Sequence, residues 1–134
     1  MVIFYIVVLT LSGLLLTYAG LNRMIKPLSS LCLTRYSQNP DIKLEYKSDV
    51  FNEMRSAGAQ LFFIGLIILL GIFVPQVRFW SFVFAAITFL GYAFGRVISL
   101  LLDGKVCKEL MSGFYSEIIL GILNLICIVI ILVS

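Results

Sequence analysis

Four long apolar stretches constrain the fold of this chain more than any other feature. They cover approximately residues 2–21, 56–74, 80–102 and 114–133. A helix rises about 1.5 Å per residue, so roughly 20 apolar residues cross about 30 Å of hydrocarbon. The composition agrees, because 61% of the residues are hydrophobic and only 13% are charged. The sequence therefore predicts an all-α protein, an integral membrane four-helix bundle that forms a single membrane domain over residues 1–134.

The segments that flank these stretches predict how the helices are connected. No Lys or Arg precedes the first apolar run, and Tyr18-Ala19-Gly20 is a poor cleavage site, so we expect a transmembrane helix there rather than a signal peptide. Residues 75–79 predict a tight turn, because Pro75 cannot continue a helix. The longest connection, residues 22–52, is expected to contain a short interfacial helix that begins at Pro27.

The distribution of Lys and Arg predicts the orientation in the membrane. Four spans put both chain ends on one face, where Arg78 is the lone basic residue among the ten Lys and Arg of the chain. The other nine lie on the opposite face, which the positive-inside rule assigns to the cytoplasm. We therefore expect a multi-pass protein of the cell inner (plasma) membrane, with loop 22–52 in the cytoplasm and both termini on the non-cytoplasmic side.

Small residues predict where the helices touch. Gly58 and Gly65 lie one heptad apart in the second apolar stretch, and Gly91, Gly95 and Ser99 form a ladder at four-residue spacing in the third. Small side chains let helix backbones approach closely in lipid, where apolar area alone does not drive association. Both sets are therefore expected to lie at helix–helix contacts.

Polar residues form one face on each of three helices, in the same half of the bilayer. A charged side chain that faces lipid is costly, so we expect these faces to turn inward and form a polar funnel open to the cytoplasm. Glu53, Asp103 and Glu117 are expected near the mouth of this funnel. Arg96 and Gln60 are expected deeper in the membrane, and Asn124 is expected at the floor of the funnel. The residues predicted to bind a ligand in this funnel are Glu53, Gln60, Arg96, Ser99, Asp103, Glu117 and Asn124.

The charges of the predicted funnel do not balance. Glu53, Asp103 and Glu117 supply three carboxylates, and Arg96 supplies one positive charge. Either a carboxyl group is protonated, or a cation or polar ligand enters the funnel. The alternative is purely architectural, because an Arg–Glu pair inside a helical bundle can serve only to set the register of the helices.

The residue inventory weighs against independent catalysis. The chain has no histidine, and its three cysteines have neither CxxC nor zinc-finger spacing. No glycine-rich phosphate loop and no Ser or Cys with an evident base are present. We therefore predict no catalytic residue and no metal site. We also predict no nucleic-acid partner, because the basic residues of the loops are mixed with acidic ones and are better explained by contact with anionic lipid.

Two motifs resemble a known family. Asn52-Glu53-Met54-Arg55-Ser56-Ala57-Gly58 looks like the opening of the second helix in the bacterial family called "domain of unknown function 4345". Gly95-Arg96-Val97-Ile98-Ser99-Leu100-Leu101-Leu102-Asp103-Gly104 looks like the end of its third helix, and Pro27 and Glu117 also fit. That family is similar in layout to the DoxX-like four-helix membrane proteins, which include subunits of quinone-linked oxidoreductases and membrane assembly or cargo factors.

The sequence thus predicts a non-enzymatic binding or accessory protein, whose funnel holds a lipid, a small amphiphile or a partner membrane subunit. One alternative is an accessory subunit of a quinone-linked redox complex. The other is a small proton-coupled transporter that uses Glu117 or Glu53. The sequence does not assign a cofactor, and quinone and lipid both stay open. Expected partners are membrane lipids, with a second membrane protein or a homodimer left open.

Overall fold

Four long helices make up the part of the chain that the computed structural model describes, which is residues 2–27, 47–104 and 108–133. Each is long and apolar enough to cross a membrane. The prediction of an all-α chain with four candidate membrane spans is confirmed, and the protein is accordingly treated as a multi-pass membrane protein. The helices are α1 (Val2–Ile25), α3 (Lys47–Phe73), α4 (Pro75–Leu102) and α5 (Lys108–Val133).

The helices extend beyond the predicted apolar stretches at their polar ends. α3 begins at Lys47, before the apolar stretch that starts near residue 56 and close to the expected helix start over residues 49–55, and α5 begins at Lys108, before the stretch that starts near residue 114. Hydropathy marks only the part of a helix that suits hydrocarbon, whereas the backbone hydrogen bonds continue into the polar head-group region. The short helix predicted from Pro27 onward falls almost entirely on residues outside those described.

The predicted turn over residues 75–79 is wrong. α3 ends at Phe73 and α4 begins at Pro75, so only Val74, in an extended conformation, separates the two helices. Proline suits the first position of a helix, where its missing N–H would have no partner. Arg78 stabilises this corner between α3 and α4, because its guanidinium donates to the carbonyls of Gly71 at 3.0 Å and Ile72 at 3.2 Å.

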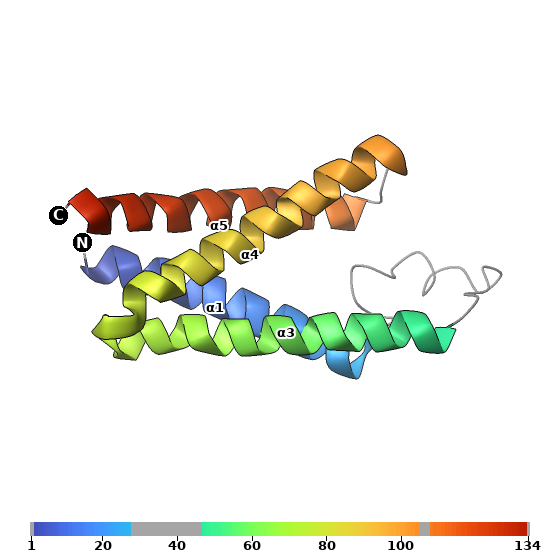
Figure 1. The fold of residues 1–134 in the computed structure, drawn as a ribbon, viewed down its shortest axis with the longest axis horizontal. Helices are drawn as coiled ribbons and strands as arrows, with labels where there is room; N and C mark the ends of the chain where they lie inside the picture. The colour runs from blue at the N-terminus through green and yellow to red at the C-terminus, as the bar shows by residue number, and fades with distance from the viewer. Residues whose placement is uncertain (1, 28–46, 105–107, 134) are drawn as a thin grey trace.

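Figure 1 shows how the helices are arranged. α1 lies along α3, and α4 crosses obliquely from the corner with α3 toward α5, so that α3 and α4 separate toward the end that lies away from the chain termini. Both termini lie at the opposite end, beside the corner. The bundle is therefore closely packed at the terminal end and splayed at the other.

Glycines allow α1 and α3 to pack closely against each other. A Cβ on Gly20 would lie 2.5 Å from the amide nitrogen of Phe62 and 2.6 Å from the carbonyl oxygen of Gly58, and one on Gly65 would meet the backbone of Thr17 at 2.6 Å. The expected contact role of Gly58 and Gly65 is confirmed. Helix backbones at this separation can pack only where side chains are absent.

The expected contact role of Gly91 and Gly95 is wrong. A Cβ on either glycine would meet no atom of the described residues within 4 Å. Because α4 diverges from α3 along this part of its length, none of the described helices packs against Gly91 or Gly95 (Figure 1). The core lies elsewhere, around the fully buried Phe82, Phe89 and Ile68, while large apolar side chains cover the outer surface, as lipid contact requires.

Candidate functional site

Two cavities lie at the splayed end of the bundle and share three polar residues, Arg23, Tyr92 and Arg96. The larger, about 610 Å³, is open and lies between α3 and α4. The smaller, about 390 Å³, is more enclosed and lies between α1, α4 and α5. The larger cavity is lined by Arg23, Glu53, Met54, Ala57, Gly91, Tyr92, Gly95, Arg96 and Ser99. Glu117, Ser116, Asn22 and apolar side chains of α1 complete the smaller one.

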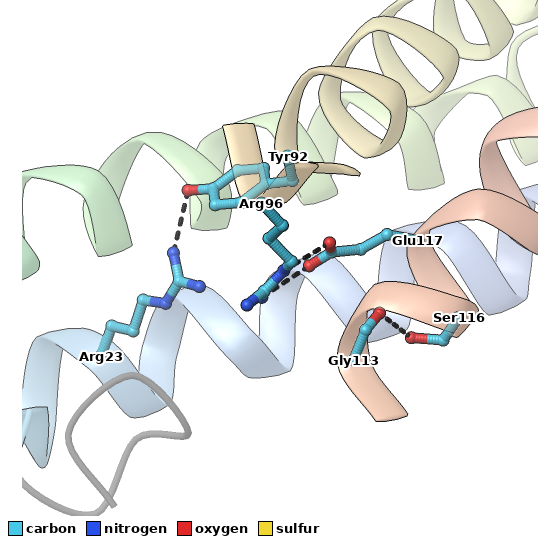
Figure 2. A network of polar contacts seen from close by, with 6 residues as sticks. All are labelled: Arg23, Tyr92, Arg96, Gly113, Ser116 and Glu117. Carbon is cyan, nitrogen blue, oxygen red and sulfur yellow. Dashed lines mark hydrogen bonds and ion pairs between the residues drawn. The ribbon is translucent and has the colours of Figure 1, made fainter. Parts of the chain in front are cut away.

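Arg96 and Glu117 form a bidentate ion pair between α4 and α5. Nε of Arg96 donates to one carboxylate oxygen of Glu117 at 2.7 Å, and an NH2 nitrogen donates to the other at 2.8 Å (Figure 2). The side chains are only 19% and 11% exposed. This parallel geometry is the strongest that the two groups can adopt, and it neutralises both charges in a site with little water. Both residues belong to the predicted funnel.

Arg23 and Tyr92 form the second contact of the site, which the sequence analysis missed. A guanidinium nitrogen of Arg23 donates to the hydroxyl of Tyr92 at 2.8 Å, and its central carbon lies 5.1 Å from the ring centroid (Figure 2). Arg23 had entered only the count of basic residues for orientation. Tyr92 lies four residues before Arg96, and this i, i+4 spacing is the signal that would have placed it on the same face.

The structure brings four of the seven predicted residues to the cavities. Glu53, Arg96 and Ser99 line the larger cavity, and Arg96 and Glu117 line the smaller. Gln60 is exposed on α3 and lines neither. Asp103 is also exposed outside them, where it accepts a hydrogen bond from the hydroxyl of Ser99 at 2.9 Å.

Asn124 lies deeper in the bundle and lines neither cavity. Its side chain is fully buried, and its amide nitrogen donates to the hydroxyl of Ser12 at 2.8 Å and to the carbonyl of Leu120 at 2.7 Å. Its carbonyl oxygen has no hydrogen-bond partner among residues 2–27, 47–104 and 108–133. The contact with Ser12 joins α5 to α1, which is an architectural use of a polar group inside a membrane bundle.

The charge balance of the site differs from the predicted one. Arg23 adds a positive charge that the count from the sequence left out, and Asp103 lies outside both cavities. Around the cavities, Arg23 and Arg96 therefore stand against Glu53 and Glu117, two positive charges against two negative. Within the described residues, no group of three or more His, Cys, Asp or Glu side chains could hold a metal ion.

The open wall of the larger cavity consists of small residues. Gly91, Gly95 and Ser99 line it from α4, and Ala57 lines it from α3. A glycine inside a helix costs about 1 kcal/mol relative to alanine. Because neither Gly91 nor Gly95 has a packing partner in the described part of the chain, the absence of their side chains has one visible consequence, which is the width of this cavity.

One comparison with known proteins identifies a relative of this chain. Residues 5–128 match the family described as "Domain of unknown function (DUF4345)". No protein of curated function and no solved structure matches the chain. The match includes all of α3 and α4, most of α1 and α5, and the residues that line both cavities.

Proposed function

Because this chain belongs to the DUF4345 family, whose description assigns no function, we propose a role from the geometry of its site. The protein binds a lipid or small amphiphile in the two cavities at the splayed end of the bundle, and it does so without chemical conversion. The bound molecule places its polar head at Arg23, Tyr92 and Arg96 and its apolar part against the helices. In this proposal the cavities face the cytoplasm, because Lys and Arg are concentrated in the sequence between and beside the first and second apolar stretches and after the third.

One observation carries the proposal: the same three polar side chains line both cavities, and the remaining walls are mostly small or apolar. Ligand sites are commonly cavities of about 300–1,000 Å³ with apolar walls and a few convergent polar groups. A ligand with one polar end and one apolar end matches this arrangement. The larger cavity opens between two helices, so such a ligand can enter from the bilayer.

The experiment that tests the proposal narrows the larger cavity without disturbing the packing of the helices. In Gly95→Leu the new side chain extends into the cavity, because no atom lies near the Cβ position. Val97→Leu is the matched control, since it places the same side chain on an exposed position of α4 that lines neither cavity. Native mass spectrometry of gently extracted protein then reports the retained molecules.

We expect wild type and Val97→Leu to retain the same amphiphile, and Gly95→Leu to lose most of it while remaining folded. Equal retention in all three proteins would overturn the proposal, as would the absence of any bound amphiphile in the wild type. Two further observations distinguish the alternatives drawn from the sequence. A quinone would favour a redox complex, and uptake that follows a proton gradient and fails in Glu117→Gln would favour a transporter.

A further inference from the structure

We infer that the polar head recognised in the larger cavity carries a phosphate and a primary ammonium group together, so that the ligand is a zwitterionic aminophospholipid. This inference rests on the proposed function and specifies its ligand. It follows from two charges of opposite sign in the cavity wall, Arg23 and Glu53, neither of which has an oppositely charged partner among the described residues, and from their order along the helices.

Arg23 supplies the positive charge. Its partner among the described residues is the hydroxyl of Tyr92, which is neutral. Both oxygens of Glu117, the buried carboxylate that lines the smaller cavity with Arg23, already accept from Arg96. A guanidinium beside a hydroxyl and without a carboxylate partner is a favourable site for a phosphate, which it can bind through two parallel hydrogen bonds.

Glu53 supplies the negative charge. Its exposed side chain lines the same cavity as Arg23, and no described residue forms a hydrogen bond or ion pair with it. A head group with a phosphate alone would gain at Arg23 and be repelled at Glu53. A head group that also carries a primary ammonium offers N–H donors to the carboxylate, whereas a trimethylammonium group offers none.

The two charges lie in the order that such a head group requires. Arg23 packs beside Gly58, where a Cβ would lie 2.9 Å from the Cβ of Arg23. Glu53 lies five residues closer to the start of α3, which is roughly 7.5 Å nearer to the membrane surface by helical rise. In a phospholipid the phosphate lies closer to the acyl chains and the amine lies farther out, so phosphate meets Arg23 and ammonium meets Glu53.

The wall opposite accommodates the rest of the molecule. Gly91 and Gly95 leave open space along α4 beside these charges, and Met54 and Ala57 line the cavity from α3. The opening between α3 and α4 lets the acyl chains remain in the bilayer while the head group occupies the cavity. A membrane phospholipid therefore fits this cavity better than a water-soluble phosphate compound, which would gain nothing from the apolar wall.

The test compares three lipids with identical acyl chains: phosphatidylethanolamine, phosphatidylglycerol and phosphatidylcholine. Each is added in equal amount to delipidated, full-length protein in detergent, and native mass spectrometry measures the bound fraction. We expect wild type to prefer phosphatidylethanolamine over the other two by about tenfold, a typical effect of one charge-assisted hydrogen bond. Glu53→Gln should abolish this preference while phospholipid binding persists, and Arg23→Gln should lower the binding of all three lipids.

Asp49→Asn is the matched control, because it removes a carboxylate from the same end of α3 at a position outside the cavity. Its lipid preference should equal that of wild type. Phospholipid binding without a preference, or a preference that survives Glu53→Gln, would overturn this inference and leave the proposed function standing. Absence of any phospholipid from wild type would overturn both. Glu53 is exposed, so its variant should fold normally.

Discussion

Arg96 and Glu117 are two charged residues that neutralise each other inside the bundle. The pair joins α4 to α5 through two hydrogen bonds, with little exposed surface on either side chain. Each charge is acceptable in this apolar setting because the other neutralises it. The same pair also lines a cavity, so its structural and ligand-binding contributions must be separated by experiment.

Glu117→Gln is expected to destabilise the protein by about 3 kcal/mol, because it leaves the guanidinium of Arg96 without its carboxylate in a poorly solvated place. The double variant Arg96→Met, Glu117→Leu should recover much of this loss, since it removes both charges and fills the space with apolar atoms. Equilibrium unfolding in mixed micelles measures both effects. A double variant less stable than Glu117→Gln would show that the pair contributes more than mutual neutralisation.

Glycine has opposite roles on two elements of this fold. On α1 and α3, Gly20, Gly58 and Gly65 remove side chains from a helix–helix contact. On α4, Gly91 and Gly95 remove them from a cavity wall, where none of the other described helices comes within 4 Å of the Cβ positions. The divergence of α4 from α3 creates this difference (Figure 1). Substitution by alanine should therefore have opposite effects at the two kinds of position.

Gly20→Ala is expected to lower the thermal stability clearly, because its Cβ would overlap the backbone of α3 and force the helices apart. Gly95→Ala should raise the stability by up to about 1 kcal/mol, since alanine is the better helix former and meets nothing at that position. Thermal unfolding of the two variants beside wild type measures the contrast. A loss of stability in Gly95→Ala would show that another molecule packs against Gly95 in the wall of the larger cavity.

The whole molecule is polarised along its length. Arg78 lies at the corner between α3 and α4, where it donates to the carbonyls of Gly71 and Ile72. Figure 1 shows both chain ends at the same closely packed end as this corner. The cavities and their charges lie at the splayed end. In the proposed orientation the cavities face the cytoplasm, because the positive-inside rule assigns to the cytoplasm the face on which the sequence predicts nine of the ten Lys and Arg residues.

We therefore expect alkaline phosphatase, which folds only outside the cytoplasm, to be active when fused after Ser134 and inactive when inserted after Gln38. A fluorescent protein that matures only in the cytoplasm should give the opposite pattern at the same two positions. Enzyme activity at the Gln38 insertion, with none at the C-terminal fusion, would reverse the orientation and place the cavities on the outer side.

The sequence alone determined the four spans and the inward position of Arg96 and Glu117. Hydropathy and the spacing of residues along one helix are local properties, and a charged side chain in a span has few alternatives to a partner inside the bundle. The resemblance carried by the motifs around Glu53 and Arg96 also pointed to the family that the comparison then identified.

Only the tertiary structure decided which polar faces meet. Spacing along a helix shows that Glu53 and Gln60 share a side, but the crossing angles between helices determine that Glu53 borders a cavity and Gln60 does not. The contact between Arg23 and Tyr92 joins residues 69 positions apart, and the open wall at Gly95 depends on the divergence of α4. These features result from the packing of all helices together, because the rotation and tilt of each helix are set by its neighbours.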